Sequence, residues 1–152
     1  MKASKTTRTP SILAPAMVWG VVGLSALGFV ISSYVTGVAF HWVRPDTRWV
    51  PPVCRMEEET CALVVFTPQA RLFGPPNSLL GQVFYMALPL AALAGALDLD
   101  WARLAIQTIS LATVILGLYL TYALLFINRV HCVLCYISHV INTALFVLLL
   151  MT

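Results

Sequence analysis

The residues of this 152-residue chain that could carry chemistry are four cysteines in two close pairs. Cys132 and Cys135 form a Cys-x-x-Cys motif, and six residues separate Cys54 from Cys61. Paired cysteines can exchange disulfides, staple a loop, bind a metal ion or pack as small apolar side chains. Which of these uses applies depends on the elements that hold each pair.

The pair at Cys132 and Cys135 stands where an apolar run begins, in the stretch NRVHCVLCYISHV. At the start of a helix, unpaired backbone N–H groups and the positive end of the helix dipole favour a thiolate over a thiol. A thiolate is the species that attacks a disulfide, so this position suits redox exchange. The motif alone is short and common, and two buried apolar cysteines would fit it as well.

The pair at Cys54 and Cys61 has two further interpretations. It could be a structural disulfide that staples a loop in an oxidising compartment. Alternatively, both pairs and His131 could supply a tetrahedral zinc site. The six-residue gap is wider than the usual spacing of about two to four residues between paired zinc cysteines, so we expect no metal.

The elements that position these pairs are predicted to be membrane helices. Hydrophobic residues make up 60% of the chain, charged residues only 10%, and the mean hydropathy is +0.89. Each of four apolar runs is near the roughly 20 residues that span a bilayer. We therefore expect an all-α membrane protein, a single four-transmembrane-helix bundle over 1–152 with helices at about 12–40, 79–97, 104–127 and 133–151.

The outer loop predicted at 41–78 contains Cys54 and Cys61. Its second part, CALVVFTPQARLFG, is apolar and predicts a short helix or half-helix that caps the bundle. Counting the crossings places this loop and the head of the fourth helix at the same face. Basic residues before the first helix favour a cytoplasmic N-terminus, so both pairs should face outward.

The basic amino terminus needs no nucleic-acid partner, because a net charge of +3 with cations ahead of a helix is what a membrane anchor requires. The first apolar run is longer than the roughly 7–15 residues of the apolar region of a signal peptide, so we expect it to be retained as an anchor. Two cysteine pairs at one membrane face could then relay electrons from an external dithiol to an acceptor in the lipid, such as a quinone.

These features together resemble the vitamin K epoxide reductase family of four-helix membrane thiol oxidoreductases, which includes bacterial members. The resemblance rests on the loop motif Cys-x6-Cys, on PNSLLGQVFY at 76–85 and on CVLC at 132–135. It implies that Cys54 exchanges with a partner protein and that Cys61 relays to the membrane pair. By the same resemblance, Cys132 accepts the relay and Cys135 is the thiolate that reacts with a quinone.

The resemblance also suggests residues that contact the quinone. Thr67 matches a family position that carries a hydroxyl, and Asn77 matches an asparagine that hydrogen-bonds a quinone oxygen. Tyr85 could line the same pocket, although packing within the bundle is the alternative. His139 stands where vertebrate members carry a tyrosine, four residues after Cys135 and on the same helix face.

His139 could donate a hydrogen bond to a quinone carbonyl. Alternatively, it is a core histidine satisfied by Ser138, Asn142 or a backbone carbonyl. His139 and the compact length favour a bacterial-type homologue.

The predicted function is a thiol–quinone oxidoreductase that supports disulfide bond formation. We expect a monomer in the bacterial cytoplasmic membrane, with a thioredoxin-like partner supplied in trans and ubiquinone, menaquinone or vitamin K as acceptor. One alternative is a vitamin K epoxide or quinone reductase of the endoplasmic reticulum membrane, with a lumenal active site. A non-enzymatic alternative is a cysteine-stapled or zinc-binding membrane protein.

Overall fold

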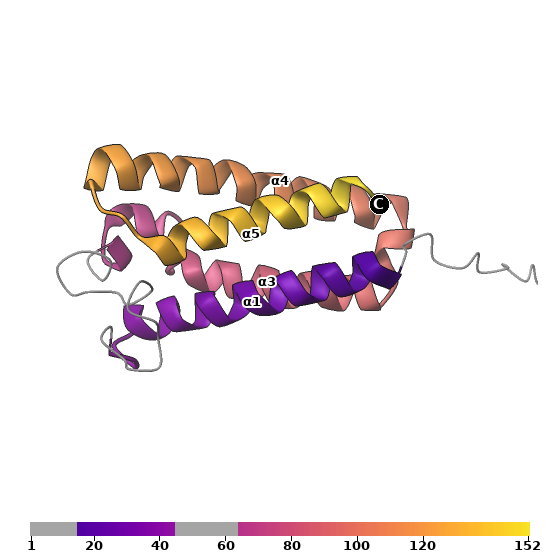
Figure 1. Ribbon diagram of the computed structural model, residues 1–152, viewed down its shortest axis with the longest axis horizontal. Helices are drawn as coiled ribbons and strands as arrows, with labels where there is room; N and C mark the ends of the chain where they lie inside the picture. The colour runs from indigo at the N-terminus through magenta and orange to yellow at the C-terminus, as the bar shows by residue number, and fades with distance from the viewer. Residues whose placement is uncertain (1–14, 45–63) are drawn as a thin grey trace, which may run out of the picture.

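The computed structural model describes residues 15–44 and 64–152, and this part of the chain is helical without a β-strand. Four long helices run side by side along the molecule (Figure 1). They are α1 (Pro15–Ala39), α3 (Asn77–Leu93), α4 (Asp100–Tyr122) and α5 (Val133–Leu150). Shorter pieces connect or extend them: the 3-10 turns η2 (Pro68–Arg71) and η3 (Ala96–Asp98), and the π-helical stretch η4 (Ala123–Asn128).

Three of the helices are long and apolar enough to cross a membrane: α1 with 25 residues, α4 continued by η4 with 29, and α5 with 18. At 1.5 Å per residue, even the shortest reaches about 27 Å, close to the roughly 30 Å of a hydrocarbon core. The outward side of α4 is apolar, and Leu118 is 67% exposed. The apolar helix α3 has only 17 residues, so a fourth crossing stays a prediction.

The turn between α3 and α4 lies earlier than the sequence predicted. α3 occupies 77–93 rather than 79–97, because Gly95 adopts a left-handed φ of 71° that ends the helical path. α4 begins at Asp100 rather than at residue 104. The Asp100 carboxylate favours a helix N-terminus, and it accepts a 2.8 Å hydrogen bond from Arg103 one turn later.

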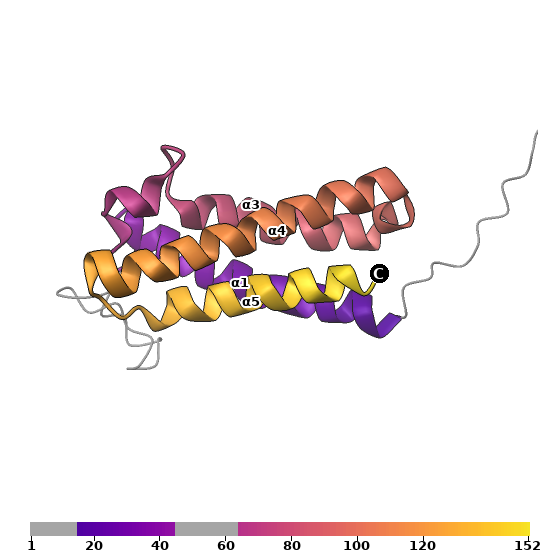
Figure 2. The same cartoon turned by 90° about the horizontal axis from the view of Figure 1, so that it is seen from above.

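Packing is closest between α1 and α3, between α4 and α5, and between α1 and α5 (Figures 1 and 2). α3 and α4 follow one another in the chain, yet each packs mainly on a different neighbour. Hydrogen bonds support these contacts: Gln82 donates to Ser33 across α1 and α3, and Gln107 donates to a carbonyl of α5. Such bonds between helices help to fix their register in a bilayer.

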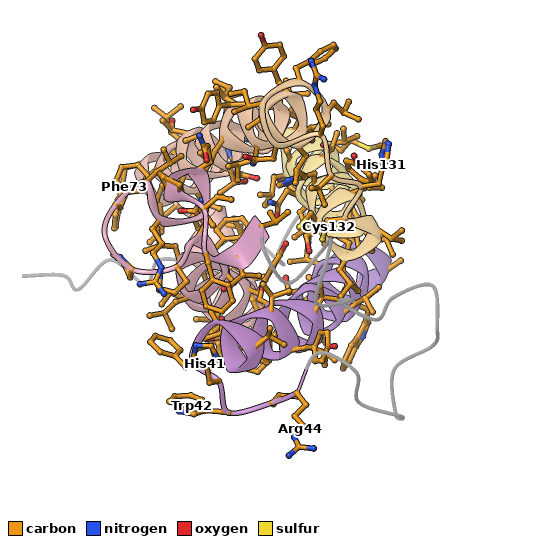
Figure 3. All side chains as sticks on the ribbon, turned by 90° about the vertical axis from the view of Figure 1, so that its left-hand side faces the viewer. His41, Trp42, Arg44, Phe73, His131 and Cys132 are labelled. Atoms are coloured by element: carbon orange, nitrogen blue, oxygen red, sulfur yellow. The ribbon has the colours of Figure 1, made fainter. Side chains whose placement is uncertain are left out.

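One end of the bundle gathers segments that are far apart in the sequence. Figure 3 looks onto this end, where Arg44, Phe73 and Cys132 are labelled. The described parts of the predicted outer loop therefore lie at the same end of the bundle as the head of α5, as counting the crossings predicted. Cys54 and Cys61 lie outside the described residues, and so does the start of the predicted first helix at 12–14.

The described part of the predicted cap holds the short turn η2 and two buried valines, Val64 and Val65. These valines belong to the buried core that the four long helices form. The segment therefore packs on the bundle rather than extending into solvent. A complete cap over this end stays a prediction, because the preceding loop is outside the described residues.

Candidate redox site at the head of α5

A cavity of about 200 Å³ lies between the helices, next to the end that carries Cys132. All four long helices and the segment after Val64 contribute to its walls, which are mainly apolar. Five residues predicted from the sequence line it together: Thr67, Asn77, Tyr85, Cys135 and His139. The fold therefore brings side chains from the loop, α3 and α5 to one shared space.

The cysteine pair forms one edge of this cavity. Cys132 is the N-cap residue of α5, with an extended backbone, and its side chain is fully buried. Cys135 lies in the first turn, where its Sγ donates to the Sγ of Cys132 at 2.7 Å. Only Cys135 of this pair lines the cavity. The two sulfurs are thus in contact, and one of them faces the space that a ligand could fill.

Asn77 is the first residue of α3 and joins the cavity to the loop segment. Its Nδ2 donates to the backbone carbonyl of Gln69 at 2.8 Å, whereas its Oδ1 is buried without a hydrogen-bond partner. The Thr67 hydroxyl is less available as a donor to a ligand, because it already donates to the carbonyl of Val64 at 2.8 Å. The Nδ2 of Asn77 is therefore held by a hydrogen bond, whereas its Oδ1 has no hydrogen-bond partner.

Gln69 also lines the cavity, although the sequence interpretation did not select it. Its side-chain carbonyl, Oε1, is buried and has no hydrogen-bond partner. One signal was present in the sequence, since Gln69 is the single amide side chain in the apolar stretch ALVVFTPQARLFG. A polar group in a segment that packs on the core is expected to have a partner.

His139 lies one turn below Cys135 on α5 and lines the cavity. Its ring packs on the backbone of α4, because a Cβ built on Gly117 would be 2.9 Å from Nδ1. That nitrogen is buried without a partner. Ser138 donates to a carbonyl of its own helix, and the Asn142 oxygen accepts from a tyrosine. Neither of these neighbours satisfies His139, and its role toward a quinone stays a prediction.

Tyr85 packs within the bundle, which was the alternative to its lining the pocket, and it also makes a hydrogen bond to another helix. Its ring covers Gly28 of α1, and its hydroxyl donates to Asn142 Oδ1 of α5 at 2.7 Å. The side chain is 3% exposed. Tyr85 thus links α1, α3 and α5 at the cavity wall, and its hydroxyl hydrogen is already engaged.

Metal ligands do not gather among residues 15–44 and 64–152, where no group of three or more His, Cys, Asp or Glu side chains could hold an ion. A zinc site that used Cys54 and Cys61 would draw on residues outside these ranges.

Comparison with known families confirms the resemblance noted from the motifs. The model described as the Vitamin K epoxide reductase family matches residues 19–150, which include most of α1, the other three long helices and both cysteine pairs. The match and the three apolar helices identify a multi-pass membrane protein and an oxidoreductase. The chain belongs to the vitamin K epoxide reductase family.

Proposed function

We propose that this protein passes electrons from Cys54 and Cys61 to Cys132 and Cys135 and then to a membrane quinone. One observation supports this most strongly: the Sγ atoms of Cys132 and Cys135 lie 2.7 Å apart, and Cys135 borders a cavity with unpartnered polar atoms. A structural disulfide or a pair of cysteines that only pack in the core would need neither the cavity nor those polar atoms.

The cavity suits a quinone ring in size and in chemistry. An apolar cavity of about 150 Å³ holds benzene, so about 200 Å³ has room for a substituted ring. Apolar walls fit the faces of such a ring, and a few placed polar groups orient it. Asn77 and His139 offer such groups from two different helices.

The residues of the chain divide the chemistry between them. A bound quinone supplies an acceptor for two electrons and two protons. Cys135 gives up electrons toward the cavity while Cys132, in contact with it, closes the disulfide, so two thiols lose two electrons and two protons together. The second N–H of Asn77 Nδ2 and a ring N–H of His139 can donate toward negative charge that develops in the cavity.

A matched pair of substitutions on α5 tests this arrangement. His139→Phe removes the ring donor from the cavity wall, so we expect slower quinone reduction with unchanged thiol exchange at the loop pair. Val140→Phe places the same ring at the next residue, which is 68% exposed on the surface of the bundle, and should change neither rate. An unchanged quinone rate in His139→Phe would assign this histidine to the packing of the core.

Upstream, we propose that a separate thioredoxin-like protein reduces the Cys54–Cys61 disulfide and that Cys61 then attacks Cys132. His139 in place of the vertebrate tyrosine supports a bacterial cytoplasmic membrane as the location, with ubiquinone or menaquinone as acceptor. The physiological result would be reoxidation of a disulfide-forming partner.

Trapped intermediates test this relay. In Cys135→Ala, the Cys132 thiolate can attack the Cys54–Cys61 disulfide at Cys61 and release Cys54 as a thiolate. Because Cys135 is no longer present to attack Cys132 and release Cys61, the Cys61–Cys132 bond should accumulate and appear in the mass of nonreduced peptides. Cys61→Ala should instead leave Cys54 bound to the partner protein. If neither variant accumulates a mixed disulfide, the cysteines are staples or ligands and the relay is wrong.

A further inference from the structure

Two carbonyl oxygens in the cavity wall have no donor. Gln69 Oε1 and Asn77 Oδ1 are both buried, both lack a hydrogen-bond partner, and both residues line the cavity. The orientation of Asn77 is fixed, because its Nδ2 donates to the backbone carbonyl of Gln69 at 2.8 Å. At these two positions the wall therefore holds acceptors that have no donor, while the second N–H of Asn77 Nδ2 stays available.

Buried acceptors are rarely left without a donor in native structures, because they lose water and gain nothing in exchange. Two of them in one wall suit a ligand that carries O–H groups. The oxidised and reduced forms of a quinone differ in this property: the quinone has carbonyl oxygens, which only accept, whereas the quinol has hydroxyls, which also donate.

We propose that Gln69 and Asn77 together bind the hydroxyl groups of the quinol, so that the cavity holds the reduced ligand more tightly than the oxidised one. This inference rests on the proposed function and adds which redox form the site prefers. It assigns Gln69 as a specificity-determining residue.

The preference would drive electron flow out of the cysteine pair. In the overall exchange, the thiols of Cys132 and Cys135 become a disulfide, and the quinone gains two electrons and two protons to become the quinol. Tighter binding of the product raises the reduction potential of the bound couple. A tenfold preference corresponds to about 30 mV for two electrons.

Direct binding measurements test the preference. Full-length Cys135→Ala protein in nanodiscs, kept without oxygen, would be titrated with a short-chain ubiquinone and separately with its quinol. The substitution prevents electron transfer from changing the probe. We expect the quinol to bind about tenfold more tightly, the factor that one hydrogen bond supplies. Gln69→Leu in the same background should remove about tenfold of quinol affinity and leave quinone affinity unchanged.

Two further variants separate binding from folding. Gln69→Glu keeps an acceptor at this position and should retain the quinol preference. Gln107→Leu makes the same chemical change outside the cavity wall, where Gln107 donates to Leu149, and should leave the ratio of the two affinities unchanged.

Equal affinities that Gln69→Leu does not alter would show that water satisfies the two carbonyls, and would overturn the inference while leaving the proposed function intact. If neither ubiquinone nor ubiquinol binds, the quinone site itself is wrong, and the inference fails with it.

Discussion

Gly28 is expected to be indispensable to the contact between α1 and α3, because the ring of Tyr85 occupies the space where a side chain would be. A Cβ built on Gly28 would lie 2.5 Å, 2.6 Å and 2.8 Å from three ring carbons. Carbon atoms prefer a separation of about 3.5–4.0 Å, so Gly28→Ala must push the ring away by about 1 Å or more. Tyr85 is 3% exposed, so any movement of its ring must disturb buried contacts or fill part of the cavity that it lines.

The expected cost has two parts. Overpacking of a filled core costs about 1–3 kcal/mol. Displacing the ring also breaks the 2.7 Å bond from Tyr85 to Asn142, and a buried acceptor left without its donor costs about 1–3 kcal/mol. Alanine returns up to about 1 kcal/mol through its higher helix propensity. The net loss in the free energy of unfolding is therefore about 1–6 kcal/mol.

Thermal unfolding in one defined detergent and lipid mixture measures this loss, with Gly23→Ala as the matched control on the same helix. A Cβ on Gly23 meets no atom within 4 Å, so this variant should be neutral or slightly more stable. For a chain of this size, each kcal/mol shifts the melting temperature by about 2–4 °C. Equal melting temperatures for the two variants would refute the packing of Tyr85 on Gly28.

Three further predictions concern the packing of the helices around the cavity. Tyr85→Phe keeps the ring and removes the hydroxyl, with its 2.7 Å bond to Asn142 and its 3.4 Å contact with the Ser138 carbonyl, so it should cost about 1–3 kcal/mol in the same unfolding assay; no change would mean that these bonds are absent. Gly117→Ala brings a Cβ to 2.9 Å from His139 and should slow quinone reduction while disulfide exchange at the loop pair continues; equal slowing of both steps would contradict a local effect. Leu145→Ala truncates a fully buried side chain and should lower the unfolding free energy by about 2–5 kcal/mol, whereas a loss below about 1 kcal/mol would contradict its place in the core.

The sequence was informative where a single property of the chain decides the structure. Hydropathy is such a property, and it predicted the head of α5 at residue 133, next to Cys132. Counting the helices likewise predicted that the loop and the head of α5 lie at one end, because this prediction depends only on the number of helices. Helix ends that depend on short-range capping were less accurate, as the early start of α4 at Asp100 shows.

Side-chain contacts between helices could not be predicted in the same way. Gly117 lies beneath His139, and Gly28 beneath Tyr85, only because two helices meet in one particular register. Gln69 acquires an unsatisfied carbonyl only because its segment packs against the bundle. Such contacts depend on the relative translation and rotation of whole helices, which hydrophobic patterns along one chain do not specify.

The central claim is that Cys135 delivers electrons to a quinone in the cavity beside it. The most direct measurement starts from fully reduced protein without oxygen, adds quinone, and follows both quinol absorbance and the number of titratable thiols. The wild-type protein should form one quinol for every two thiols lost, and Cys135→Ala should form almost none. If all four wild-type thiols remain reduced, or if Cys135→Ala reduces quinone at the wild-type rate, the claim is contradicted.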